Sequence, residues 1–176
     1  DCLEAAAEAF RRSHRLLRTP GGSEGQHLPT FSRTSPAKLR HDIEQIEYLE
    51  KQGLADGELH SVAKTLRTVL AGMPDDLPKG RTIPLSSLVR RRLRGIYNRC
   101  HHYRETPALS TAAVNPGLEP DKIVADYQSR PPGLTWIDDF LSAQALDELR
   151  RFCLESTIWY DFEHTNGYVG AYLQEG

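Results

Sequence analysis

The 176-residue sequence has few cysteines, no long apolar run and no excess of one charge. Its three cysteines (Cys2, Cys100 and Cys153) are far apart and have no Cys-x-x-Cys spacing, so we expect reduced thiols in a cytoplasmic protein rather than a disulfide framework. No segment approaches the roughly 18 apolar residues of a membrane span, and residues 1–19 are too charged for a signal peptide. The 22 basic and 24 acidic residues nearly balance, so the net charge gives the chain no overall attraction to nucleic acid or anionic membranes.

The overall composition is that of a folded protein, because 39% of the residues are hydrophobic and 26% are charged. The length suits one ordinary domain or two small modules. The chain begins at Asp1 rather than at a methionine. We therefore expect an excerpt of a longer protein.

The first part of the sequence predicts helices. Apolar residues recur at helical spacing over residues 3–18, and a polar linker follows. A second helix starts at the capping residue Ser35 and ends at Gly53, and a third starts at Asp56. The short connection makes the last two an antiparallel hairpin. Its apolar stripes are Leu39, Ile43, Ile46 and Leu49, then Leu59, Val62, Leu66, Val69 and Leu70.

A Pro-rich connector over residues 75–133 separates this helical region, residues 1–74, from the C-terminal part. Within the connector we expect a short basic helix over residues 85–97 and one or two helical turns near residues 121–128. No second copy of the hairpin occurs in the chain, so any repeat array would have to precede it.

The pattern changes at Leu134, where we place the last domain, residues 134–176. Residues 134–137 predict a strand, and Ser142 caps a helix with the stripe Leu146, Leu149, Phe152 and Cys153. Residues 158–162 and 168–173 are rich in β-branched and aromatic residues and flank Asn166-Gly167, which predicts a β-hairpin. Its outer edges need cover from further residues, since a lone hairpin is marginal in water.

The run Trp136-Ile-Asp-Asp-Phe-Leu-Ser, followed by the helix over residues 143–153, resembles the opening of prolyl-4-hydroxylase-like 2-oxoglutarate/Fe(II) dioxygenases. Residues 151–162 and 167–173 are similar to a bacterial branch in which the catalytic barrel follows tetratricopeptide-type helical repeats. The resemblance covers residues 134–173 and rests on the order of the elements. It implies an α+β chain, in which a helical N-terminal region precedes the first strand, helix and hairpin of a double-stranded β-helix (jelly-roll-like) barrel.

The resemblance also implies Fe(II) and 2-oxoglutarate as cofactors of the parent protein, with hydroxylation of a protein or peptide side chain as its reaction. The family holds iron with a His-x-Asp/Glu pair and a distant histidine. None of the seven histidines here has an acidic residue two positions later. We therefore assign no catalytic or metal-binding residue, expect no cofactor to bind this fragment, and expect the fragment alone to be inactive.

Three polar clusters have both a functional and a structural interpretation. Adjacent ligands in Cys100-His101-His102 cannot all reach one zinc ion without strain, so a polar loop is favoured. The arginines over residues 90–99 suggest phosphate binding, although a solvated helix face is favoured. The acidic residues Asp138, Asp139, Asp161 and Glu163 show no sign of convergence and are interpreted as structural.

The aromatic residues over 159–172 are the most concentrated set, and core packing is their favoured role. Alternation places Ile158, Tyr160 and Phe162 on one face. Tyr168 and Tyr172 are the preferred candidates for lining a cofactor or substrate cavity in the parent protein.

Two other functions stay open. One is a helical-repeat module for protein–protein interaction, whose barrel is not catalytic. The other is a basic adaptor centred on residues 90–99, whose binding to RNA or phosphate would weaken steeply with salt. We expect a protein or peptide as the substrate or partner, and expect neither a membrane nor nucleic acid.

Overall fold

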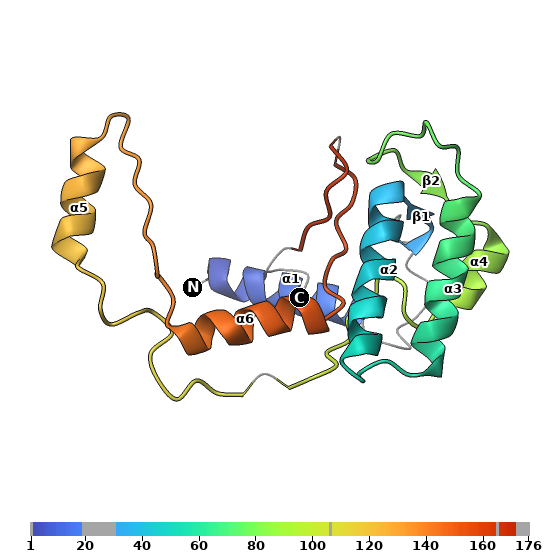
Figure 1. Cartoon of the computed structure of the whole chain (residues 1–176), viewed down its shortest axis with the longest axis horizontal. Helices are drawn as coiled ribbons and strands as arrows, with labels where there is room; N and C mark the ends of the chain where they lie inside the picture. The colour runs from blue at the N-terminus through green and yellow to red at the C-terminus, as the bar shows by residue number, and fades with distance from the viewer. Residues whose placement is uncertain (1, 19–30, 106, 165, 172–176) are drawn as a thin grey trace. The chain divides into compact units, whose positions relative to one another are not determined.

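The computed structural model describes residues 2–18, 31–105, 107–164 and 166–171. The chain forms two compact units. The first comprises Asp1–Arg104 and Leu154–Gly176, and the second comprises Glu105–Cys153. Helices dominate, and a two-stranded antiparallel sheet accompanies them (Figure 1). The described residues therefore form a mixed structure that is compatible with the expected α+β class.

The first unit contains four helices and the small sheet in the part of it that the structure describes. The helices are α1 (Cys2–Arg18), α2 (Pro36–Lys51), α3 (Gly57–Ala71) and α4 (Ser87–Leu93). Strand β1 (Arg33–Thr34) pairs with β2 (Ile83–Pro84), with Arg33 opposite Pro84 and Thr34 opposite Ile83. The second unit contains α5 (Pro120–Ser129) and most of α6 (Ala143–Glu155). The predicted linker after α1 lies mainly outside the described residues.

The predicted helix signals are confirmed around the α2–α3 hairpin. The Ser35 hydroxyl accepts a hydrogen bond from the Lys38 amide (3.1 Å), and the Asp56 carboxylate accepts bonds from the amides of Glu58 and Leu59 (both 3.0 Å). These bonds satisfy amide groups that the first turn of a helix leaves without partners. Gly53 ends the α2 region with a φ of +70°, a conformation that favours glycine.

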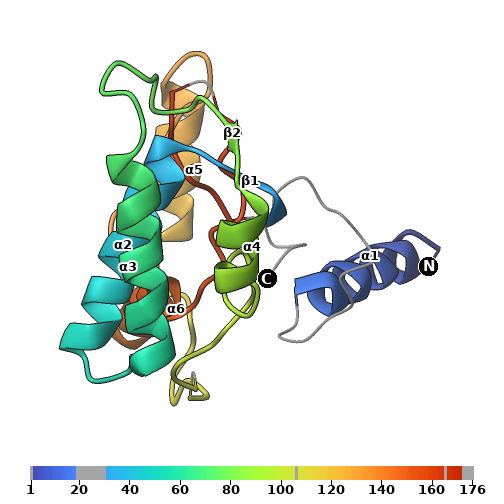
Figure 2. The same ribbon diagram turned by 90° about the vertical axis from the view of Figure 1, so that its right-hand side faces the viewer.

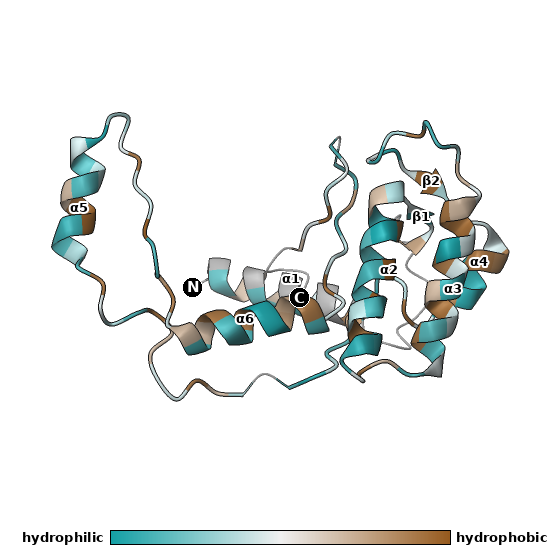
Figure 3. Ribbon diagram, in the orientation of Figure 1, coloured by the Kyte–Doolittle hydropathy of each residue, from teal (hydrophilic) through white to brown (hydrophobic). Residues whose placement is uncertain are grey.

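The hairpin supplies the main core of the first unit. Helices α2 and α3 lie side by side, as Figures 1 and 2 show. The predicted stripe of α2 is buried, and so are Leu59, Val62 and Leu66 of α3. Leu85, Leu93, Ile96 and Tyr97 complete this cluster, so the segment around α4 covers the hairpin. Teal, hydrophilic residues occupy most of the visible outer face of α2 (Figure 3).

The predicted short helices of the connector are present with different bounds. The basic helix is α4, which is shorter than the predicted residues 85–97, and the predicted turns near residues 121–128 belong to the longer α5. Ser142 precedes α6 as expected, since its hydroxyl accepts a hydrogen bond from the Ala145 amide (3.3 Å). Leu146 and Leu149 of the predicted α6 stripe are exposed, however.

The predicted strand over residues 134–137 is wrong. This segment forms no strand and has no ladder partner among the described residues, and the Leu134 and Trp136 side chains are exposed. A strand exists only where a second backbone accepts and donates its hydrogen bonds. The high β propensity of these residues does not by itself provide a neighbouring strand.

The predicted hairpin over residues 158–173 is present only as a single antiparallel pair. Asp161 and Gly170 exchange two backbone hydrogen bonds of 3.1 and 2.7 Å. Gly167 lies in the turn between them with a φ of +69°, and its amide donates to the His164 carbonyl (2.9 Å), so the predicted turn is confirmed. Residues 172 and 173 lie outside the described residues.

The helices were also compared with the dimensions of a lipid bilayer. Among the described residues, no helix combines the length and the apolar character that crossing a membrane requires.

Candidate functional site

A small, largely apolar cavity with polar groups at its wall lies in the first unit. Helix α2 contributes Lys38, Asp42 and Gln45, and apolar side chains of α3 form another wall. The remaining lining comes from two segments that follow in the chain. These residues are Ile96, Tyr97, Asn98, Thr157, Trp159 and Tyr160.

An ion pair between Lys38 and Asp42 is the main charged feature of this cavity. The Lys38 ammonium donates hydrogen bonds to both carboxylate oxygens, at 2.5 and 2.7 Å. The two residues are one helical turn apart on α2, which brings their side chains together. Only 5% of the Lys38 side chain and 13% of the Asp42 side chain are exposed. The pair is therefore shielded from solvent.

Burial and charge shift the pKa values of this pair. Burial lowers the pKa of the Lys38 amine, although the Asp42 carboxylate opposes this effect. Burial alone would raise the pKa of Asp42, but the Lys38 ammonium and the neighbouring His41 hold it below its ordinary value. The His41 Nδ1 atom lies 3.1 Å from an Asp42 oxygen. Asp42 thus remains an anion at neutral pH.

Tyr97 closes the cavity beside this pair. Its hydroxyl donates a hydrogen bond to the Arg33 carbonyl (2.7 Å), and the Lys38 ammonium lies 5.4 Å from the centre of its ring. Burial and the charge of Asp42 raise the pKa of the Tyr97 phenol. Tyr97 is therefore a neutral hydrogen-bond donor that connects β1 to the core.

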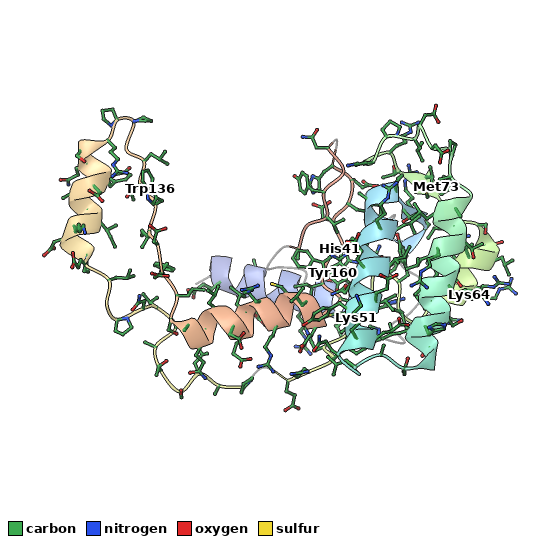
Figure 4. All side chains as sticks on the ribbon, viewed as in Figure 1. His41, Lys51, Lys64, Met73, Trp136 and Tyr160 are labelled. Carbon is green, nitrogen blue, oxygen red and sulfur yellow. The ribbon has the colours of Figure 1, made fainter. Side chains whose placement is uncertain are left out.

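The other wall of the cavity consists of aromatic residues from the C-terminal segment. The Tyr160 ring is fully buried, and the Arg18 guanidinium lies 3.7 Å from its centre in a cation–π contact. The Trp159 ring meets the His41 ring edge to face, with 5.5 Å between their centres. Figure 4 labels His41 on α2 and Tyr160 on the C-terminal segment.

The size of this cavity limits its chemistry. Its volume is about 30 Å³, which provides room for water, whereas small-molecule sites measure roughly 300–1,000 Å³. The residues around it are bound to one another or packed in the core. We conclude that this site joins four segments of the first unit rather than holding an organic substrate.

Metal binding was considered for the whole described part of the chain. Within these residues, no group of three or more His, Cys, Asp or Glu side chains is close enough to hold one ion. The described residues do not fit the two-histidine, one-carboxylate set that iron requires in the family resembled above.

Tyr168 and Tyr172 were the preferred site residues. The Tyr168 side chain is 54% exposed, and its ring stacks on that of His164 with 3.7 Å between centres and 13° between planes. Its proposed role in lining a cofactor cavity stays a prediction. Tyr172 lies outside the described residues. Of the other aromatics, Tyr160 and Phe162 are buried together with Ile158, which confirms the predicted alternation.

The acidic candidates have separate neighbours. Asp161 lies 3.0 Å from His164 Nε2, and Glu163 lies 3.8 Å from the Arg33 guanidinium. Asp139, in the second unit, has a φ of +52°. Its backbone carbonyl accepts a hydrogen bond from the Asn115 amide group (2.9 Å). The carboxylates of Asp161 and Glu163 thus contact different partners, and the structural interpretation of the acidic residues stays a prediction.

The basic candidates divide into an exposed and a buried part. Arg90, Arg91 and Arg94 lie on one side of α4 and its C-terminal end and line an open surface hollow of about 360 Å³. Arg99 does not belong to this surface, because it is buried and its guanidinium lies 4.4 Å from the centre of the Phe31 ring. Arg90, Arg91, Arg92 and Arg94 are exposed, which agrees with the interpretation of these arginines as a solvated helix face.

The two adjacent histidines point in different directions. The Cys100 sulfur lies 3.3 Å from His102 Nε2, whereas His101 Nε2 lies 3.2 Å from the Gly95 carbonyl. Cys100 and His102 therefore form a pair that excludes His101. The interpretation of these residues as a polar loop is incomplete, because His102 pairs with Ser156 in an antiparallel bridge.

Sequence analysis did not find the buried Lys38–Asp42 pair or the contact of His102 with Ser156. The first carries a sequence signal, since Lys and Asp four residues apart on a helix attract one another. Its burial depends on Tyr97 and Tyr160, which are distant in the sequence. The second carries the signal of alternation, which places Cys100 and His102 on one face of an extended segment.

Comparison with known proteins gives no relative for this chain: no protein-family model, curated protein or solved structure matches it.

Proposed function

We propose that this chain is the leading segment of a 2-oxoglutarate/Fe(II)-dependent oxygenase of the prolyl-4-hydroxylase-like family, which hydroxylates a protein or peptide side chain. In this proposal the iron-binding core belongs to the parent protein and not to this chain. The chain would contain the first elements of a double-stranded β-helix barrel. The protein would be cytoplasmic. The iron and 2-oxoglutarate of the parent would supply the oxidation chemistry.

The observation that carries the proposal is the antiparallel pair formed by Asp161 and Gly170 after α6. The helix, the following segment, the glycine turn and the returning segment come in the order that the resemblance implies, whereas the strand that it implies before the helix is not formed. Ile158, Tyr160 and Phe162 are buried on one side of the first extended segment, so this segment already has one packed face, as a barrel strand does.

The exposed stripe of α6 supports the same proposal. Leu146 and Leu149 are 47% and 50% exposed. An amphipathic helix gains stability by packing such a stripe against another element. In the family resembled, the corresponding helix supports the barrel. In the parent protein, barrel strands would therefore cover these two side chains of α6.

The test is succinate release by the protein made from its complete reading frame. We expect succinate only when Fe(II) and 2-oxoglutarate are both present, and none from residues 1–176 alone under the same conditions. The cavity-lining prediction is tested with Tyr168→Phe and Tyr168→Ala variants of the complete protein. The quantity measured is the concentration of 2-oxoglutarate that gives half the maximal rate of succinate release. Absence of succinate from the complete protein would overturn the proposal.

A protein–protein interaction module is a second candidate, because apolar side chains are exposed on the second unit. Trp136 and Phe140 are 66% and 47% exposed. Phe140 also lines an open hollow of about 750 Å³ beside the start of α6. Exposed aromatic residues are typical of interaction surfaces. A complete protein that releases no succinate would favour this candidate.

A further inference from the structure

Two segments far apart in the sequence pair in antiparallel fashion after α4 and α6. His102 lies opposite Ser156 in an antiparallel bridge. The Tyr103 amide donates to the Glu155 carbonyl (3.1 Å), and the Thr157 amide donates to the His101 carbonyl (3.0 Å). These hydrogen bonds fix the register of the two segments.

This pairing brings three side chains onto one face. Alternate residues of an extended segment share a face, and directly opposed residues of an antiparallel pair lie on the same side. Cys100 and His102 therefore meet Ser156. The Cys100 sulfur lies 3.3 Å from His102 Nε2, and His102 Nδ1 lies 2.9 Å from the Ser156 hydroxyl oxygen.

The neighbouring histidine lies on the opposite face and provides a contrast. The His101 ring stacks on Tyr103, with 5.9 Å between centres and 16° between planes. Its Nε2 atom lies 3.2 Å from the Gly95 carbonyl. His101 is thus next to His102 in the sequence, but its imidazole contacts Tyr103 and Gly95.

The three side chains differ in exposure in a way that suits a surface thiol site. Ser156 is 1% exposed, so its hydroxyl is a fixed partner at the base of the group. His102 is exposed and Cys100 is partly exposed. A small molecule in solution therefore reaches the sulfur while the buried hydroxyl orients the imidazole.

We propose that Cys100 is a reactive thiol site for small disulfides, in which His102 acts as general base and Ser156 as a positioning residue. The Ser156 oxygen accepts the Nδ1 proton of His102, which leaves the Nε2 lone pair directed at the thiol. This tautomer is part of the proposal, since a hydroxyl can either donate to or accept from an imidazole nitrogen. The proposal is independent of the oxygenase proposal, because its reaction uses neither iron nor 2-oxoglutarate.

The reaction balances within the site and the disulfide. His102 Nε2 takes the thiol proton as the Cys100 sulfur attacks one sulfur of the disulfide, R–S–S–R. A mixed disulfide between Cys100 and R forms, and the other R–S⁻ leaves and takes the proton from His102. The Cys100 sulfur is oxidised, and the leaving sulfur is reduced to a thiol.

The test uses variants of the full chain that keep one cysteine each. Cys2→Ser with Cys153→Ser leaves Cys100 as the sole thiol, and Cys2→Ser with Cys100→Ser leaves Cys153, which is also partly exposed. The probe is dithiobis(nitrobenzoate) at pH 7, followed by its coloured product. Oxidised glutathione is the second probe, with the mixed disulfide detected by mass.

Three results are expected. The Cys100-only chain reacts faster than the Cys153-only chain. Adding His102→Ala to the Cys100-only chain lowers its rate about tenfold, less than the roughly hundredfold or more that a general base typically contributes, because the site is open to water. Adding His101→Ala instead changes the rate by less than about twofold, since that imidazole lies on the other face.

Two further measurements separate base catalysis from a change of structure. Free imidazole in solution should restore part of the rate to the His102→Ala chain and should not accelerate the His101→Ala chain. In concentrated urea all Cys100-only variants should react at one rate. Equal losses from His101→Ala and His102→Ala, or no gain of Cys100 over Cys153, would overturn the proposal.

Discussion

Removing the Asp42 carboxylate should destabilise the first unit strongly. The Lys38 ammonium is 5% exposed, and both of its carboxylate hydrogen bonds come from Asp42. The variant Asp42→Ala leaves this ammonium in the core without its counter-ion. Breaking a buried ion pair in this way costs about 3–5 kcal/mol.

An upper limit on this cost follows from the chemistry of the amine. Lys38 escapes the cost of an unpaired charge by losing its proton. Holding an amine with an ordinary pKa of 10.5 neutral at pH 7 costs about 5 kcal/mol. The charge contribution to the loss therefore cannot exceed that value, and an expected loss of about 4 kcal/mol lies within both limits.

The assay is urea unfolding at pH 7, followed by circular dichroism. Glu47→Ala is the matched control, because Glu47 pairs with Arg67 at 2.7 Å while both side chains are 42% exposed. An exposed pair contributes less than about 1 kcal/mol. A double change, Lys38→Met with Asp42→Leu, should restore stability to within about 2 kcal/mol of the original chain, since neither charge then remains. A loss from Asp42→Ala no larger than that from Glu47→Ala would refute the reasoning.

The Asp42 carboxylate also predicts a pH dependence of stability with a defined sign. The folded pKa of Asp42 lies below its ordinary value of 3.8. The contribution of this carboxylate is therefore fully present above that value and is lost as the pH falls through the folded pKa. The stability difference between the original chain and Asp42→Asn should shrink in that acidic range. A difference that does not change there would contradict the assigned pKa direction.

Two further predictions concern a pair of glycines and one tyrosine. Gly53→Ala should cost about 1 kcal/mol for its left-handed backbone alone, because an added Cβ meets no atom within 4 Å. Gly167→Ala should cost at least about 1 kcal/mol more than Gly53→Ala in urea unfolding, since its Cβ would lie 2.9 Å from the Gly80 amide nitrogen. Tyr97→Phe should cost about 1 kcal/mol in urea unfolding, because it removes the hydrogen bond to the Arg33 carbonyl. Equal costs at the two glycines, or an unchanged Tyr97→Phe chain, would contradict the described contacts.

Local signals account for what the sequence predicted well. The caps at Ser35 and Asp56 act within one helical turn, so the residues that create them are neighbours in the chain. The left-handed conformations of Gly53 and Gly167 likewise follow from a local preference. The α2–α3 hairpin was predictable because its stripes and its short connection lie in one continuous segment.

Strand pairing was not predictable in the same way. The segment over residues 134–137 has strand-like residues but no partner, whereas His102 pairs with Ser156 across more than fifty residues of sequence. Hydrogen bonds between distant segments depend on the whole fold, and local propensity contains no information on them. For this reason the Cys100–His102–Ser156 group was missed.

The contacts of Ser156 and its neighbours show that the helical region supports the C-terminal segment. The Gln45 side chain on α2 donates hydrogen bonds to the Leu154 and Ser156 carbonyls, at 3.2 and 2.8 Å. The Thr157 hydroxyl donates to the Arg99 carbonyl (2.6 Å). These bonds hold the backbone from which Tyr160 and the returning hairpin extend. If the segment after α6 is the start of a catalytic barrel, then α2 positions its first extended segment. A change at Gln45 should then affect that segment without touching any cofactor.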